Sequence, residues 1–350
     1  MFGYTLRRLL WLIPVLTTVG LTTFVVMHAA PGGPFDKDPN RRQLSAAAQA
    51  KLNENFGLDK PYWQQFVAYM FGDFKDEKNK QGKLVINKET GKPNRVFACG
   101  AMCLNFGPTY SSRGARTVEE TLFAAQGKKP ALFYYTARLA VQALVVALLL
   151  GIPLGTIAAL KQNTVVDYLS LFFSTLFVAI PSLIIGLFMV IIFGRVLGWV
   201  QVIPKPDDFL NRIGPWVLPT LVLGLAAAAG ITRYTRASVL EVMRQDYVRT
   251  ARAKGIAEST VVLRHILRNS LIPVVTIIFP LLAGLLTGSF FTEQIFQVPG
   301  IGRAFVTAIG ARDYSMIMGT ALIYAFLIAF ANLAVDLAYG VLDPRIKVGK

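Results

Sequence analysis

Residues 246–273 read DYVRTARAKGIAESTVVLRHILRNSLIP and form a basic, amphipathic segment between two long apolar runs. The apolar residues of this segment recur at roughly helical spacing, and Gly255 divides it into two halves. The first half has an acid at Asp246 and bases toward Lys254, directly before the glycine. This order predicts a short helix from Asp246 to Lys254, because acids favour helix starts, bases favour helix ends and glycine adopts the left-handed cap.

The second half predicts another helix that leads to Pro273. It would begin at Ser259 or Thr260, with Glu258 near its start and Arg268 near its end. A positive loop that only fixes membrane orientation would explain the charge of the segment. Such a loop would not require ordered helix ends or a glycine break, so we favour an ordered contact surface.

The composition indicates a membrane protein built from helices. Apolar residues make up 54% of the 350-residue chain, charged residues only 16%, and the mean hydropathy is +0.49. Several apolar runs exceed the ~18 residues that a helix needs to cross a bilayer. We therefore predict an all-α polytopic membrane protein. Short basic segments at the membrane surface account for the net charge of +16, so no nucleic-acid partner is expected.

Six apolar stretches are expected to span the membrane: Leu9–Met27, Leu132–Leu160, Tyr168–Phe193, Trp216–Ile231, Leu271–Phe291 and Tyr314–Tyr339. Pro181 and Pro280 are expected to bend the third and the fifth. The first is long for a signal-peptide core, although the small residues of HAAPGG (28–33) keep cleavage open as an alternative. Short inner segments hold fourteen Lys and Arg residues against five in the two short outer loops, which predicts cytoplasmic N- and C-termini.

Three parts follow from this arrangement. Residues 1–28 form the N-terminal tail and the first span, and residues 29–130 form an extracytoplasmic segment. Residues 131–350 form the core with the remaining spans, and its cytoplasmic loop covers 241–270.

Cys99 and Cys103 are the only cysteines and lie in the extracytoplasmic segment as C-x-x-x-C. We expect a local disulfide that pins this segment, and two free thiols without a role remain the alternative. No metal site is expected, because two cysteines without a nearby histidine supply too few ligands.

The spans carry few charges, which argues against an ion-coupled carrier. Asp336 lies near the cytoplasmic end of the last span and is interpreted as an inner-face anchor that Arg345 could pair with. Arg138 is expected to extend from the second span to the headgroups. The chain also lacks a phosphate-binding loop and a filter-like channel motif. A transporter without its own energy source needs a partner, and the basic segment is the surface suited to bind one.

The residues 240–276, LEVMRQDYVRTARAKGIAESTVVLRHILRNSLIPVVT, resemble the cytoplasmic signature of the B-type permease subunit of bacterial dipeptide and oligopeptide ABC importers. Arg249, Thr250 and Ala251 occupy the Glu-Ala-Ala positions of importers in general, and Gly255 matches the glycine that follows. The missing glutamate leaves open how Arg249 makes its contact. The resemblance continues in four further segments: RRLLWLIPVLTTVGLTTFVVMHAAPGGP (7–34), FGLDKPYWQQFVAYMFG (56–72), TEQIFQVPGIGR (292–303) and NLAVDLAYGVLDPRI (332–346).

The resemblance implies a type I ABC importer permease fold and a multi-pass subunit of the inner (plasma) membrane. Its implied partners are a second permease, two cytoplasmic ATPase subunits that hold ATP and Mg, and an extracytoplasmic substrate-binding protein. This chain itself would bind no cofactor or metal and would carry no catalytic residue. The implied ATPase-coupling residues are Asp246, Tyr247, Arg249, Thr250, Ala251, Arg252, Ala253, Lys254 and Gly255. The implied external gate loop holds Glu293, Pro299, Gly300, Gly302 and Arg303.

One departure from the family pattern is an insert near residues 73–103, before the stretch LNFGPTYSS (104–112). The insert would contact the binding protein or cap the external mouth, and a tolerated surface insertion is the alternative. Related permeases also carry nickel, oligosaccharides or glutathione, and these substrates remain open beside peptides. A stand-alone carrier or channel and a membrane-anchored scaffold are the disfavoured classes.

Overall fold

The computed structural model describes residues 2–35, 46–76, 95–125, 127, 129–201 and 204–342. Its chain divides into two compact units. Unit 1 comprises Met1–Arg8, Leu132–Arg303 and Leu327–Lys350, and unit 2 comprises Leu9–Ala131 and Ala304–Phe326. Three helices have residues in both units, namely α1 (Phe2–Ala29), α14 (Ile301–Ala311) and α15 (Tyr314–Leu342).

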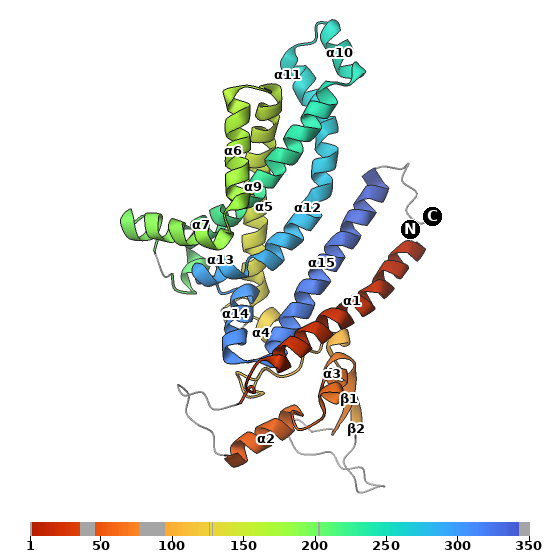
Figure 1. The fold of residues 1–350 in the computed structure, drawn as a ribbon, viewed down its shortest axis with the longest axis vertical. Helices are drawn as coiled ribbons and strands as arrows, with labels where there is room; N and C mark the ends of the chain where they lie inside the picture. The colour runs from red at the N-terminus through yellow and green to blue at the C-terminus, as the bar shows by residue number, and fades with distance from the viewer. Residues whose placement is uncertain are drawn as a thin grey trace. The chain divides into compact units, whose positions relative to one another are not determined.

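The regular elements in the described part of unit 1 are all helices, joined by loops (Figure 1). Its remaining helices are α5 (Leu132–Leu160), α6 (Val165–Ala179), α7 (Ser182–Met189), α8 (Asp208–Asn211), α9 (Gly214–Met243), α10 (Asp246–Ala253), α11 (Glu258–Thr260), α12 (Arg268–Gly288) and α13 (Phe290–Ile295). Two π-helical stretches, Val190–Val196 and Val261–Leu267, continue α7 and α11.

Unit 2 combines short helices with a hairpin. It contains α2 (Ala46–Phe56), α3 (Tyr62–Met70), the strands β1 (Gly72–Asp76) and β2 (Arg95–Cys99), a 3-10 turn (Ala101–Cys103) and α4 (Val118–Phe123). The strands are antiparallel, with Gly72 opposite Cys99 and Asp76 opposite Arg95. They are the flanks of the predicted insert, whose residues 77–94 lie outside the described residues.

The predicted membrane-protein class is confirmed. Five described helices are long and apolar enough to cross a bilayer, and a sixth span is counted if one bent pair crosses as a unit. That pair is α6 with α7 and its π-helical continuation, which meet at an angle of 98° (Figure 1). The predicted bend at Pro181 is therefore present, and the helix is interrupted there between α6 and α7. Ile180 is extended, as expected for a residue before proline, and Pro181 caps the start of α7.

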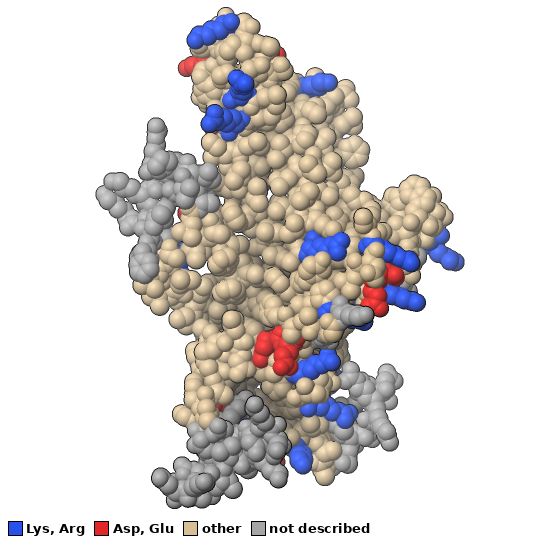
Figure 2. All heavy atoms as spheres, turned by 180° about the vertical axis from the view of Figure 1, so that it is seen from behind, with Lys and Arg blue, Asp and Glu red and all other residues tan. Residues whose placement is uncertain are grey.

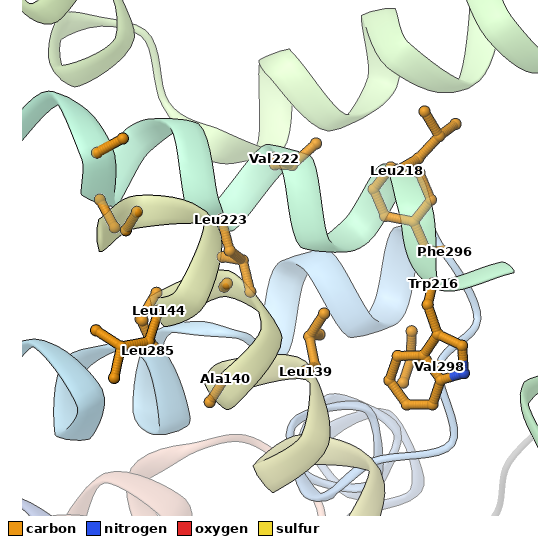
Figure 3. Close-up of a cluster of buried hydrophobic side chains, with 14 of the residues drawn as sticks. Leu139, Ala140, Leu144, Trp216, Leu218, Val222, Leu223, Leu285, Phe296 and Val298 are labelled. Carbon is orange, nitrogen blue, oxygen red and sulfur yellow. The ribbon is translucent and has the colours of Figure 1, made fainter. Parts of the chain in front are cut away.

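The core of unit 1 forms where α5 packs against α9 over most of their lengths. Small residues bring the two backbones together. A Cβ at Gly151 would lie 2.7 Å from the Cβ of Ile231, and one at Gly224 would lie 2.9 Å from the Cβ of Val146. Figure 3 shows the apolar cluster around this contact, which adds residues of α12 and of the segment after α13: Leu139, Ala140, Leu144, Trp216, Leu218, Val222, Leu223, Leu285, Phe296 and Val298.

The helices on either side of the basic segment are longer than the sequence predicts. α9 continues beyond the expected end at Ile231 to Met243, directly before α10. The helix after Gly255 begins at Glu258, one residue earlier than expected, and continues past Pro273 and Pro280 to the end of α12. Proline is tolerated inside such spans because neighbouring helices and side chains satisfy the freed backbone groups.

Candidate functional site

The short helix α10 forms where the charge pattern predicts it. It runs from Asp246 to Ala253, and Lys254 is its C-cap. Gly255 has φ +72° and its N–H donates to the carbonyl of Arg252 at 3.0 Å. A Cβ at Gly255 would meet no atom within 4 Å, so the need for glycine comes from the left-handed backbone and not from lack of space.

One face of α10 is buried against the helices on either side of it. Val248 is fully buried and Ala251 nearly so, at 5% exposure. They join an apolar cluster with Ala159, Val239, Val261 and Ile266. Burying a valine contributes about 1.5–3 kcal/mol. We call this apolar cluster the seat of α10. Ala251 is part of it, so its side chain is not on the exposed face with the other predicted coupling residues.

Two polar contacts fix α10 to the helix that follows Gly255. Arg252 donates to both carboxylate oxygens of Glu258, at 2.7 and 3.2 Å, and this contact raises the pKa of the Arg252 guanidinium. The Nδ2 group of Asn269 donates to the Tyr247 hydroxyl at 2.8 Å. Exposed ion pairs of this kind contribute only ~0.2–1 kcal/mol, so the apolar seat holds α10 and these contacts set its orientation.

The outward face of α10 carries the remaining predicted coupling residues. Asp246, Arg249, Thr250, Ala253 and Lys254 are all exposed. The Arg249 guanidinium lies 3.8 Å from the Asp246 carboxylate. Figure 2 shows Lys and Arg side chains gathered at the end of unit 1 formed by α10 and α11. α10 thus presents a small, charged and exposed face above the apolar cluster that holds it.

The seat continues into the long helices. The Ser238 hydroxyl on α9 donates to the Ser270 carbonyl on α12 at 2.8 Å. Arg236 on α9 donates two hydrogen bonds of 2.6 and 2.7 Å to Asp167 on α6, whose carboxylate is 1% exposed. Asn163 also donates its backbone N–H to Asp167. These hydrogen bonds join α9 to α12 and to α6.

Sequence reasoning missed the Asp167–Arg236 pair, because Arg236 entered it only as one of the fourteen Lys and Arg residues of the inner segments. The available signal was Asp167 itself, an acid at the start of an otherwise apolar run. Such a charge needs a partner when it is buried.

The predicted external gate loop contains a buried acid that holds a helix start. Glu293 is fully buried, and its carboxylate accepts from the Ser289 hydroxyl at 2.8 Å and from the Arg303 backbone N–H at 3.0 Å. Gly302 and Thr136 also hydrogen-bond to it. A carboxylate is favoured at this place because the first backbone N–H groups of α14 lack helical acceptors.

Thr136 joins the loop to α5 and was not predicted from the sequence. Its hydroxyl accepts from the Ile301 N–H at 2.9 Å. Gly300 lies against both Glu293 and Thr136, where any Cβ would collide with their oxygens. The structure thus brings four predicted gate residues together, Glu293, Gly300, Gly302 and Arg303, while Pro299 lies half-buried in the link before α14.

Arg138 packs on an aromatic ring of the helix bundle. Its guanidinium carbon lies 4.5 Å from the centre of the Trp216 ring, and Nη1 lies 3.5 Å from the Tyr134 hydroxyl. Trp216 is buried between Tyr135 and Phe209. A cation over an indole face is attracted by the ring, so this contact holds Arg138 against the helix bundle.

Two smaller predictions concern ionic and covalent links. Asp336 pairs with Arg8 at 2.9 Å, and its expected partner Arg345 lies outside the described residues. Cys99 and Cys103 are joined by a disulfide, and Asn105 donates to the Cys99 carbonyl at 2.9 Å. No group of three or more metal-ligating side chains occurs in the described part of the chain.

The chain is similar in sequence to membrane components of known transport systems. The family model for the binding-protein-dependent transport system inner membrane component matches residues 151–348. The oligopeptide transport system permease protein AppB of Bacillus subtilis is 33% identical over 99% of this chain and 100% of its own length. The dipeptide transport system permease protein DppB of Alkalihalophilus pseudofirmus is 35% identical over the same shares. The MetNI methionine ABC transporter in an inward-facing conformation matches 60% of this chain and 94% of its own chain, with 18% identity and a TM-score of 0.48.

Proposed function

The chain belongs to the family of binding-protein-dependent transport system inner membrane components, and we propose that it is the permease subunit of an ATP-driven importer of di- and oligopeptides. Full-length similarity to permeases named for these substrates supports the substrate class. In this proposal the chain forms half of a translocation pathway, and a second, homologous permease forms the other half.

The observation that carries the proposal is the seating of α10. A charged helix of eight residues stands on an apolar cluster made by α9 and the helix after Gly255. Its exposed face suits a cytoplasmic ATPase partner, because charged groups on a surface select and orient a partner. The proposal therefore assigns ATP and Mg to two ATPase subunits and no catalytic residue to this chain. It also places both termini and α10 in the cytoplasm.

Coupling would proceed by rigid movement of helices. Closure of the ATPase pair on ATP would displace α10 together with the ends of α9 and α12, because Val248, Ala251 and the Arg252–Glu258 contact leave it little freedom to move alone. α12 leads directly into α13, which carries Glu293. The same displacement would then reach the loop that Glu293 and Thr136 hold, and switch it between two arrangements.

An extracytoplasmic binding protein would deliver the peptide to the opposite side of the membrane. Because that protein selects the ligand before the permease meets it, the permease needs no highly selective site of its own. The proposal therefore names no substrate-selecting side chain in the pathway.

The decisive experiment reconstitutes the chain in proteoliposomes with its second permease, the two ATPases and the binding protein. ATP-dependent accumulation of a radiolabelled dipeptide is expected, with competition by other short peptides. Nickel, a maltooligosaccharide and glutathione are the competitors that separate the alternative substrates. Competition by one of these together with failure of peptides to accumulate would contradict the peptide assignment. Flux through the purified chain alone would contradict the importer assignment.

A further inference from the structure

A cavity of about 830 Å³ lies entirely within unit 2. Its wall is formed by the C-terminal end of α1, by α2 and α3, by the hairpin β1–β2, by the loop before α4 and by the first turn of α15. Pockets that hold small molecules usually measure ~300–1,000 Å³. This cavity is distinct from the α10 surface and from the Glu293 loop, which belong to unit 1.

The floor of the cavity is apolar and aromatic. Phe24, Met27, Tyr314 and Met318 line it and are all buried. The rings on this floor are bulky and rigid, so they offer a large apolar surface at little cost in side-chain entropy.

Two tyrosine hydroxyls add polar groups beside this floor. The Tyr69 hydroxyl donates to the Ser315 carbonyl at 3.3 Å, and Tyr110 hydrogen-bonds to the Ser315 side chain. Burial raises the pKa of both tyrosines, so both hydroxyls keep their protons at any working pH.

The rim of the cavity carries charges of both signs. Lys51 and Glu54 lie one helical turn apart on α2 and are exposed. Lys60 and Asp73 also line the cavity and form an ion pair of 2.8 Å. Within the part of the chain that the structure describes, neither Lys51 nor Glu54 takes part in an ion pair. These two side chains are therefore the charges that a ligand can engage without breaking an existing pair.

This combination selects a class of ligand by exclusion. Glu54 would repel an anion, and Lys51 would repel a cation. A purely apolar molecule would form no ion pair with either side chain. Residues one turn apart on a helix have Cβ atoms ~5–6 Å apart, and the two residues of a dipeptide span up to ~7 Å. The two charged groups stand at the ends of flexible side chains that start ~5–6 Å apart, so they can reach the two ends of one dipeptide.

We propose that this cavity binds a short zwitterionic peptide, with its carboxylate at Lys51, its ammonium group at Glu54 and an apolar side chain on the floor formed by Phe24 and Tyr314. The choice of a peptide among zwitterions rests on the proposed function. The permease then has a peptide site of its own, apart from the translocation pathway and from the binding protein.

The test measures equilibrium binding of radiolabelled Ala-Phe to the purified complex of permeases and ATPases, without binding protein and without nucleotide. Lys51→Glu and Glu54→Lys are each expected to weaken binding about tenfold, and the double variant is expected to regain most of it with the peptide reversed. Ala68→Phe places a ring in the cavity and is expected to abolish binding.

Two control variants make the same chemical changes outside the cavity. Asp59→Lys reverses an exposed charge in the loop next to α2, and Val67→Phe adds a ring on the exposed face of α3. Both are expected to bind like the wild type. A peptide with an acetylated N-terminus and an amidated C-terminus is expected to bind at least tenfold more weakly than Ala-Phe.

Three results would overturn the inference: no binding of Ala-Phe, equal binding of the capped peptide, or binding that the cavity variants and the control variants affect alike. Uptake by the complete complex is measured in parallel. Absent equilibrium binding with intact peptide uptake would reject this site alone, whereas binding at the cavity with no peptide uptake would reject the proposed function alone.

Discussion

The guanidinium of Arg252 binds both carboxylate oxygens of Glu258 and so bridges the glycine break at residue 255. Because the partner of Arg252 lies in the same chain, a charge substitution at Arg252 disturbs the orientation of α10 as well as any contact with the ATPase. Arg252→Glu places two acids together and should weaken ATPase association by up to about fivefold, as expected from the loss of ~0.2–1 kcal/mol. Co-purification at graded ATPase concentration measures this effect.

The matched variant for this prediction is the exchange Arg252→Glu with Glu258→Arg, which restores the internal pair with reversed charges. It should recover most of the association, whereas Arg249→Glu on the exposed face should not be rescued by any change at Glu258. If the exchange binds the ATPase no better than Arg252→Glu alone, Arg252 acts by contacting the partner and not by orienting α10.

Gly255 tests whether the left-handed cap is needed for coupling. Gly255→Val should uncouple ATP hydrolysis from uptake, because a side chain at φ +72° costs ~1–2 kcal/mol or more and distorts the turn after α10. Gly255→Asn should keep coupling, because asparagine tolerates this conformation and a Cβ meets no neighbour there. The measurement is the number of ATP molecules hydrolysed per peptide transported. Equal ratios for the valine and asparagine variants would show that the cap has no role in coupling.

The Glu293 loop should be sensitive to a single methyl group. Gly300→Ala pushes a Cβ into the carboxylate of Glu293 and the hydroxyl of Thr136, and overpacking of this kind costs ~1–3 kcal/mol. Thermal unfolding of the detergent-purified chain should shift down by several degrees. Gly284→Ala on α12 is the control, because a Cβ there meets no atom within 4 Å. Gly284→Ala should leave the unfolding temperature unchanged or raise it, because alanine favours a helix more than glycine does. An equal fall in both variants would mean that the contact with Glu293 does not set the effect.

The Asp167–Arg236 pair should contribute to the stability of unit 1. Asp167→Asn leaves the partly buried Arg236 without its charged partner and should lower the free energy of unfolding by about 3 kcal/mol, the lower end for buried pairs because Arg236 is 20% exposed. Asp246→Asn disrupts the exposed pair with Arg249, whose charged atoms lie 3.8 Å apart, and should change little. Denaturant unfolding monitored by tryptophan fluorescence compares them. Similar losses at both positions would contradict the special role of Asp167.

The disulfide between Cys99 and Cys103 is tested by mass. Alkylation of the unreduced protein isolated from membranes should add no label, and alkylation after reduction should add two. Two labels without reduction would show that the thiols are free in the cell.

Local charge order and apolar run length were sufficient to predict α10, its glycine cap and the apolar spans. Asp246, Lys254 and Gly255 mark the start and end of α10 within a few residues of one another, so these ends can be predicted along the chain, whereas the contact of Arg252 with Glu258 was not predicted. Contacts between distant residues were not readable in this way. The pairing of Asp167 with Arg236 and the joint hold of Glu293 and Thr136 on α14 depend on which helices pack together.

Two details depend on surroundings that the sequence does not supply. The predicted bend of the third span lies at Pro181, and its size of 98° follows from the extended backbone of Ile180, which separates α6 from α7. The contact of Arg138 with the Trp216 ring depends on the packing of α5 against α9.

The close contact of α5 with α9 has a practical consequence for measuring the transport cycle. Gly151 and Gly224 leave no room for even a methyl group between the two backbones. We therefore expect α5 and α9 to move as one rigid pair during the transport cycle. A pair of spin labels on their exposed faces should report the same separation with and without ATP. The distance within this pair would be a constant reference. Changes in the distance to labels on α10 or α14 can then be compared with it in the same sample.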